Sequence, residues 1–388
     1  MSEFLLSLLV VTGLIHLFGR VWLLAGFYAI KKEENDRFSS KKADLPSLSV
    51  IVAARDEASN LQAFLPGILS QNYPEFEVLV VLDRCEDGSM QVVQELAQEF
   101  PFLRYVEIRD KPSGWAGKKW ALSQGIAQAH FPFLVFTDAD CEVEADWLVS
   151  HGRAFASGAK LVLGLGMYRY RPGVLNRLIR YETAHTAFQY LGAAGHHKAY
   201  MGVGRNMAYH RSLYDAQSGF ASFSESLSGD DDLLVNHADR FVESRGLVRP
   251  GSRTWSEPEH EWRNWLRQKG RHFSASARYT GFSKVSLALF HGSQIAFYGL
   301  SGFFLVGGGH IWVGLAAYLV YLLGSWYIFG LFAKEIQQNN LIRYYPLLDL
   351  AYACYHSLIA PFGLLARPSW QTNQNRKSRK IHSKTASS

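Results

Sequence analysis

Two aspartates one residue apart, Asp138 and Asp140, are the side chains of this sequence best suited to chemistry. They follow an apolar run, residues 133–136, in the stretch FLVFTDADC. Such a run is typical of a strand buried on both faces, so we expect both acids just past its carboxyl end, at the ligand edge of an open sheet. Alternate residues of an extended segment point the same way, and carboxylate oxygens suit Mg²⁺ or Mn²⁺. The alternative is a polar turn in which Asp140 only caps a helix.

A second acidic group, Asp230 to Asp232, lies in the stretch SGDDDL. Like-charge crowding in such a group raises the proton affinity of the central residue, Asp231, toward the range that a general base needs. The alternative is that the three acids only cap a helix over residues 233–238.

The elements that must position these acids alternate between strand and helix. Apolar runs predict strands at residues 48–54, 76–82, 103–107 and 133–136, and helical periodicity lies between them at 58–70, 89–99 and 118–129. This alternation predicts an α/β domain with a mostly parallel sheet and helices on both faces. The first two strands run into ARDE and LDRCEDGS, which should then lie beside Asp138.

Six motifs in this order resemble family 2 inverting glycosyltransferases. They are VIVAARDE (50–57), VVLDRCEDGS (80–89), GKKWALSQG (117–125), TDAD (137–140), SGDDDL (228–233) and QKGRH (268–272). The last two are similar to motifs of the membrane-bound branch, which includes cellulose, chitin and hyaluronan synthases and ceramide glucosyltransferases. The resemblance implies a GT-A type nucleotide-diphospho-sugar transferase fold and a UDP-sugar donor.

The resemblance also implies a role for each matching residue. The base and ribose of the donor would lie against Ala53, Arg55, Glu57 and Asp83. Lys118 would meet a phosphate at a helix amino end, although the neighbouring Lys119 leaves this assignment open by one position.

At the centre of the implied site, Asp138 would contact the nucleotide and share a metal, Mg²⁺ or Mn²⁺, with Asp140. Asp231 would be the catalytic base. Gln268 and Arg271 share a helix face and would lean over the nucleotide, while His272 stands where the family prefers tryptophan. Residues 200–209 resemble the acceptor-side segment, with unusual Arg205 and Asn206 in it.

The composition indicates a membrane portion. Hydrophobic residues make up 48% of the 388 residues and charged residues only 19%. Residues 4–30, 285–306 and 311–332 are each apolar and long enough to cross a bilayer. A cleavable signal peptide is the alternative for the first segment, but only Glu3 is charged before Phe4.

Basic residues after Ile30 place that side of the first segment in the cytosol. Arg20 lies inside this segment and needs a partner, for which Asp349 is a candidate. Residues 344–366 contain Asp349, and crossing there would leave the basic tail outside, so we expect an interfacial or re-entrant segment.

The expected organisation has six parts: a membrane anchor (1–30), a linker (31–47), a cytosolic glycosyltransferase domain (48–258), an interfacial amphipathic helix (259–280), a membrane region (281–366) and a basic tail (367–388). The basic tail and the net charge of +6 suit contact with membrane lipid headgroups. We expect no nucleic-acid partner.

These features predict an integral protein of the cell (inner) membrane that transfers a sugar from a UDP-sugar to a hydroxyl of a lipid-linked or glycan acceptor. The alternative is a catalytically silent membrane scaffold of a polysaccharide synthesis or export complex.

Overall fold

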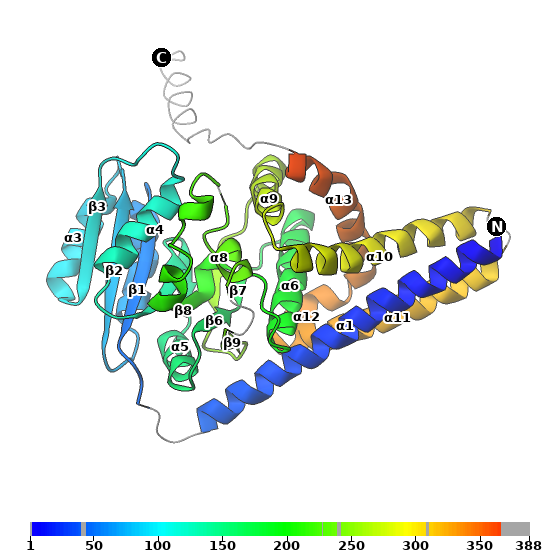
Figure 1. The fold of residues 1–388 in the computed structure, drawn as a ribbon, viewed down its shortest axis with the longest axis horizontal. Helices are drawn as coiled ribbons and strands as arrows, with labels where there is room; N and C mark the ends of the chain where they lie inside the picture. Colours follow the sequence, from blue (N-terminus) through cyan, green and yellow to red (C-terminus); the bar gives the residue numbers. More distant parts are fainter. Residues whose placement is uncertain (1, 40–43, 227, 239–241, 308–309, 366–388) are drawn as a thin grey trace, which may run out of the picture.

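The structure is a computed structural model, and it describes residues 2–39, 44–226, 228–238, 242–307 and 310–365. A seven-stranded sheet forms the centre of the α/β domain (Figure 1). Its strands in spatial order are β3 (Leu103–Ile108), β2 (Phe76–Asp83), β1 (Leu48–Ala54), β4 (Phe133–Asp138), β8 (Met207–His210), β6 (Leu161–Gly164) and β9 (Ser244–Leu247). Only β8 runs antiparallel to its neighbours, so the mostly parallel sheet is confirmed.

Helices cover both faces of this sheet because its central strands are apolar on both sides. In β1, Val50 and Val52 belong to one hydrophobic core and Ile51 to the other. The first core also contains α2 (Ala58–Leu69), α3 (Ser89–Glu99) and α5 (Trp147–Ala156), and the second contains α4 (Gly117–Gln128) and α6 (Val174–Ala194). Each face of the sheet is therefore closed by helices.

Short elements complete the domain beside the sheet. A second, three-stranded sheet consists of β5 (Cys141–Val143), β10 (Thr254–Ser256) and β7 (Gly166–Tyr168). The remaining elements are η1 (Gly204–Asn206), α7 (Arg211–Asp215), η2 (Ala221–Phe223) and α8 (Asp232–Asn236).

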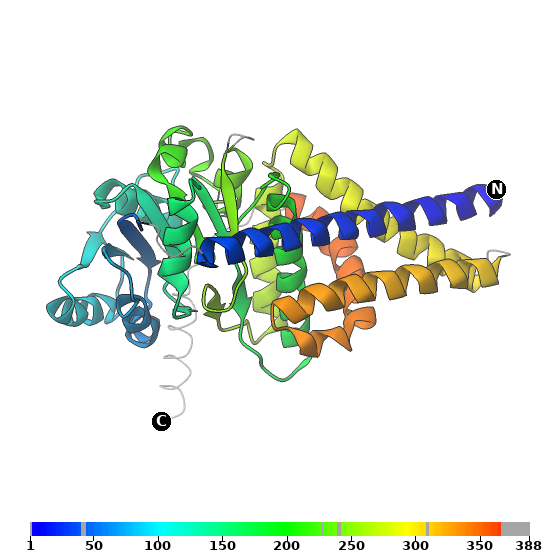
Figure 2. The same cartoon turned by 90° about the horizontal axis from the view of Figure 1, so that it is seen from below.

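Three helices in the described part of the chain are long and apolar enough to cross a membrane. These helices, α1 (Ser2–Ser39), α10 (Gly281–Val306) and α11 (Ile311–Glu335), extend together away from the sheets (Figures 1 and 2). Helix α1 continues nine residues past Ile30, so residues 31–39 of the expected linker are helical. Glu34 explains the extension, because its carboxylate accepts hydrogen bonds from the backbone of Val248 (2.9 Å) and Arg249 (3.0 Å) and ties this polar turn to the domain.

A layer of crosswise helices lies between the sheets and the three long helices (Figure 1). It contains α6, α9 (Trp262–Ser276) and α13 (Tyr345–Leu365), with α12 (Asn339–Ile342) leading into α13. On α9, Trp265 is buried against Tyr355 of α13, so this ring faces protein and not the headgroup zone. The crosswise course of α13 favours an interfacial segment, whose depth in a membrane stays a prediction. The basic tail lies outside the described residues.

The partner expected for Arg20 is confirmed. Its guanidinium lies 2.6 Å from the Asp349 carboxylate, and both side chains are buried. Tyr181 of α6 and Tyr298 of α10 donate to the same carboxylate at 2.7 Å each. One carboxylate on α13 therefore holds α1, α6 and α10 together.

Candidate active site

The predicted acids meet at the carboxyl edge of the large sheet. Asp138 is the last residue of β4 and lies beside Ala53 of β1 in the sheet register. Lys118, in the first turn of α4, donates to Asp138 at 2.8 Å and also pairs with Asp230 at 3.2 Å. Ala53, Lys118, Asp138, Asp230 and Asp231 line one small cavity. Of the two adjacent lysines, Lys118 is the one that lines this cavity.

Asp231 faces this cavity and also caps α8. One carboxylate oxygen accepts from the Gly204 amide at 2.7 Å and the other from the Asp232 amide at 2.8 Å. Burial and the adjacent Asp230 carboxylate raise the pKa of Asp231. Asp230 behaves in the opposite way: burial opposes its ionisation, but the ammonium groups of Lys118 and Lys119 bring its pKa below the usual value. Asp231 is thus the better proton acceptor of the two.

The third acid of the group, Asp232, points away into the protein. It is buried and accepts a hydrogen bond of 2.8 Å from the Tyr279 hydroxyl. Burial and the Asp231 charge raise the pKa of Asp232 to about 8. Asp232 is therefore mostly protonated at neutral pH and cannot share the role of Asp231.

Lys119 holds the acidic segment in place from behind. Its ammonium is buried and donates to the carbonyl oxygens of Ser226 (2.5 Å) and Ser228 (2.8 Å). Burial lowers the pKa of Lys119 to about 8. Two adjacent lysines thus have different places, one facing the cavity and one fixing the segment that carries Asp231.

The residues expected to bind a metal fit a hard divalent cation. Ligand atoms of Asp138, Asp140 and Cys141 lie within 4.8 Å of one another. The Cys141 thiol is buried and lies 3.0 Å from the Ser256 hydroxyl, which leaves the two carboxylates as the hard oxygen donors. Desolvation in the cleft and the Asp138 charge raise the pKa of Asp140. A divalent cation between the two carboxylates would relieve this repulsion.

The expected nucleotide pocket lies at the ends of β1 and β2. Glu57 is the N-cap residue just before α2, and its pKa is raised by desolvation, with repulsion from Asp140 and Asp138 adding to the effect. Arg55 is half-buried in the preceding turn. Asp83 is buried, and both of its oxygens accept from Arg84, at 2.8 and 2.9 Å. Asp83 is thus paired with Arg84 at this edge of the sheet, and its contact with a nucleotide stays a prediction.

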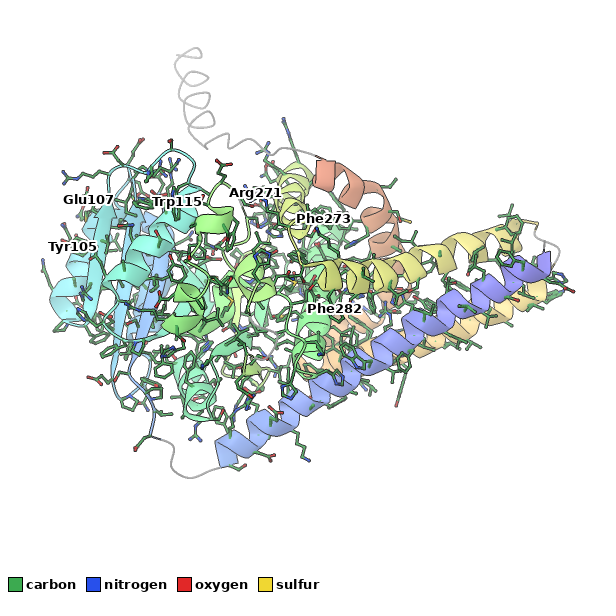
Figure 3. The ribbon with its side chains drawn as sticks, in the orientation of Figure 1. Tyr105, Glu107, Trp115, Arg271, Phe273 and Phe282 are labelled. Carbon is green, nitrogen blue, oxygen red and sulfur yellow. The ribbon has the colours of Figure 1, made fainter. Side chains whose placement is uncertain are left out.

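Gln268 and Arg271 are half-buried on α9 and do not line the small cavity. Figure 3 shows Arg271 on the side of α9 that faces the sheet domain. The ion pair of Lys269 with Glu182 (2.8 Å) fixes α9 against α6, and His272 lies within electrostatic reach of Arg205 and Asp230. Helix α9 therefore borders the site, and a contact of Gln268 and Arg271 with the nucleotide stays a prediction.

Arg205 and Asn206, taken from the sequence as acceptor-side residues, have other partners. Arg205 donates to the Gly166 carbonyl at 2.7 Å and stacks on the Tyr168 ring, close enough to Asp140 to favour its ionised form. Asn206 is fully buried and accepts from the Trp147 indole at 3.0 Å. Asn206 thus braces the core, while Arg205 supplies a cation behind the acidic pair.

Comparison with known proteins gives the same class. The model of the family described as "Glycosyltransferase like family 2" matches residues 46–275, which is more than half of the chain. The chain therefore belongs to this family, as the motifs predicted, and the GT-A type fold class is confirmed.

Individual relatives are distant. The protein named probable glycosyltransferase YdaM of Bacillus subtilis (strain 168) is 25% identical over 276 residues, which cover 69% of this chain and 63% of that one. A poly-beta-1,6-N-acetyl-D-glucosamine synthase of Staphylococcus epidermidis is 25% identical over 170 residues, or 42% of this chain and 40% of that one. The chain thus spans less than two thirds of the length of these curated relatives.

Among solved structures, the mannosyltransferase PcManGT from Pyrobaculum calidifontis, in complex with GDP-Man and Mn²⁺, is similar to this chain. It has a TM-score of 0.47 and 18% identity, and the match covers 89% of this chain and 99% of that one.

Proposed function

We propose that this protein is a membrane-bound inverting glycosyltransferase that moves a sugar from a UDP-sugar to a hydroxyl of a lipid-linked or glycan acceptor. The observation that carries the proposal is the convergence of Lys118, Asp138 and Asp231 on one cavity at the carboxyl edge of the sheet. Departure of a diphosphate requires a cation and a metal-binding carboxylate, and attack by a hydroxyl requires a proton acceptor.

In the proposed reaction, the acceptor oxygen attacks the anomeric carbon while the bond from that carbon to the diphosphate oxygen breaks. The acceptor proton passes to the Asp231 carboxylate, and the bonding electron pair leaves with the diphosphate. Attack on the face opposite the leaving group inverts the anomeric configuration.

Charge on the diphosphate would be met by Lys118, whose ammonium already lies between Asp138 and Asp230. Asp138 and Asp140 would hold Mg²⁺ or Mn²⁺, which when bound neutralises negative charge on the leaving group.

We infer a cytosolic site in the cell (inner) membrane, because Lys31, Lys32 and Arg37 follow the apolar part of α1. The Lys31 ammonium lies 2.6 Å from Glu335 at the end of α11, which supports placing both helix ends on one side.

The test is incubation of membranes that contain the full chain with Mn²⁺ and a panel of labelled nucleotide sugars. We expect label from a UDP-sugar to enter lipid or glycan, and Asp231→Asn to abolish this incorporation. A wild-type chain that binds a UDP-sugar and cleaves none of the panel with any acceptor would contradict the proposal and favour a silent scaffold.

A further inference from the structure

A large cavity lies between the catalytic domain and the long helices α1 and α10. Its volume is about 690 Å³, within the range of pockets that bind a small organic molecule. Apolar side chains of both long helices line it, including Ile15, Phe18, Trp22, Phe282 and Leu289. None of the acids of the candidate active site lines this cavity, so it is a separate space.

The α1 and α10 walls are open to the surroundings of the molecule. On α1 the lining residues recur at helical spacing and form one face, and Phe18 is 72% exposed. On α10, Leu289 is 57% exposed. Both helices are long and apolar enough to cross a membrane. The cavity therefore opens where hydrocarbon chains would surround these helices.

The opposite wall lies near the proposed catalytic base. Val235 and Asn236 of α8 line the cavity, and Asp231 caps the other end of this five-residue helix. At 1.5 Å of rise per residue, the backbone of Asp231 lies about 6 Å along the helix from that of Val235. Asn236 donates to the Tyr200 carbonyl at 2.9 Å and to the Ser283 hydroxyl at 3.1 Å. This wall of the cavity thus carries a polar side chain held in place by α10 and by the segment at Tyr200.

Close helix packing keeps the cavity preformed. A Cβ added to Gly26 of α1 would lie 2.0 Å from the Gly192 carbonyl oxygen of α6, and one added to Gly195 would lie 1.9 Å from the Gly26 oxygen. Backbones in such contact cannot approach further, so α1 has a fixed distance from α6 beside the cavity.

We propose that this cavity binds the hydrocarbon tail of a lipid acceptor, with the nucleophilic oxygen of the lipid turned toward Asp231. The inference rests on the proposed function and selects a lipid among its acceptors. A lipid tail suits walls of Ile, Leu and Phe, whereas the hydroxyl groups of a glycan would lose their hydrogen bonds there. The lipid oxygen attacks the anomeric carbon, its proton goes to Asp231, and UDP leaves with the electron pair of the broken bond.

Two tryptophan substitutions on α10 test the cavity. Ser286 lines it, whereas Ala288 is exposed and does not. The two positions lie about 200° apart around the helix, so Ser286→Trp fills the cavity and Ala288→Trp points elsewhere. Full-length protein in vesicles would be assayed for sugar transfer to diacylglycerol and, separately, to polyprenyl phosphate.

We expect Ser286→Trp to raise the KM for the lipid on the order of tenfold or more, because bulk in the cavity displaces the tail. Ala288→Trp should leave the KM within about twofold, as an exposed substitution away from the cavity does. The vesicle that supports transfer identifies a lipid alcohol or a lipid phosphate as the acceptor. Equal thermal stability of the two variants shows that both fold.

Unchanged KM values in both variants would overturn the inference. Transfer to a soluble glycan with no lipid product in either vesicle would also overturn it, while leaving the proposed function intact. Donor cleavage by the wild-type protein is measured in parallel, both without added lipid and with each acceptor. Absence of cleavage under all of these conditions would contradict the proposed function itself.

Discussion

Replacing Asp231 by asparagine removes the proposed base with almost no change in volume. A positioned general base contributes about 10²- to 10⁴-fold to a rate. At 1.36 kcal/mol for each factor of ten, the barrier should rise by about 2.7–5.4 kcal/mol. Donor binding should survive, because Lys118 and Asp138 keep their places in the cavity.

The substitution also has a structural effect that can be separated from catalysis. Both Asp231 oxygens accept backbone hydrogen bonds, from Gly204 at 2.7 Å and from Asp232 at 2.8 Å. Asparagine offers one accepting oxygen in their place, so one partly buried amide loses its acceptor, at about 1 kcal/mol of stability or more. We therefore expect a lower unfolding temperature together with the loss of turnover.

The neighbouring substitution Asp232→Asn is the matched control. Because the pKa of Asp232 is about 8, an amide resembles its mostly protonated state at pH 7 and still accepts from Tyr279. Turnover with a labelled UDP-sugar, calorimetric donor binding and thermal unfolding would be measured for both variants. Activity of Asp231→Asn within about threefold of wild type would refute the assignment, because loss of a general base should lower the rate by about 10²-fold or more.

Four further results are expected. Asp140→Ala should weaken binding of Mn²⁺ and donor together in calorimetry. Lys118→Met should weaken donor binding by about 1.5–3 kcal/mol, the value of a hydrogen bond to a charged group. Between the unfolded pKa of Asp232, about 3.9, and its folded pKa, about 8, the folded state keeps a proton that the unfolded state has released. The free energy of unfolding of the wild type should therefore fall by up to about 1.4 kcal/mol for each unit by which the pH rises over this window. Thermal unfolding of Asp232→Asn should lack this slope. Arg20→Leu should lower stability by about 3–5 kcal/mol, with partial recovery on adding Asp349→Asn.

Each of these results has an outcome that contradicts it. If neither a chelator nor Asp140→Ala changed the affinity for the donor, the metal site would be excluded. An unchanged donor affinity in Lys118→Met would show that the donor phosphate does not contact this lysine. Parallel stability curves of wild type and Asp232→Asn would mean that Asp232 is ionised in the fold, and additive losses for Arg20 and Asp349 would show that the two do not interact.

The first half of the sheet could be predicted from the sequence because its strands are apolar runs bounded by turn residues. The predicted strand at residues 48–54 and helix at 89–99 coincide with β1 and α3. Strands β6, β8 and β9 have four residues each and pair with distant segments, so no local pattern marks them. The edge with Asp138 was therefore predictable, whereas the second half of the sheet was not.

The site could be predicted only as far as residue types allow. Lys118 and Lys119 both lie in the first turn of α4, and only the packing of that helix shows which ammonium enters the cavity. The pairing of Asp83 with Arg84 was missed because adjacent side chains do not usually meet. Arg84 has φ of +51°, in the left-handed region, and this turn lets its guanidinium fold back onto the carboxylate.

Helix α1 shows why some long-range contacts can be predicted and others cannot. Arg20 needs a counter-charge because an unpaired cation among apolar residues is costly, and the carboxylate of Asp349 lies in another largely apolar segment. One oxygen of Glu34 is held by the backbone amides of residues 248 and 249, and such donors leave no trace in a sequence. The same helix is thus fixed to α13 by Arg20 and to the catalytic domain by Glu34. Arg20 lies within the stretch of α1 that lines the large cavity, and Glu34 lies on the carboxyl side of this stretch. Because the two contacts fix α1 to the rest of the molecule, the cavity and Asp231 keep one separation, and binding of the acceptor rather than movement of a domain must bring the reacting oxygen to the base.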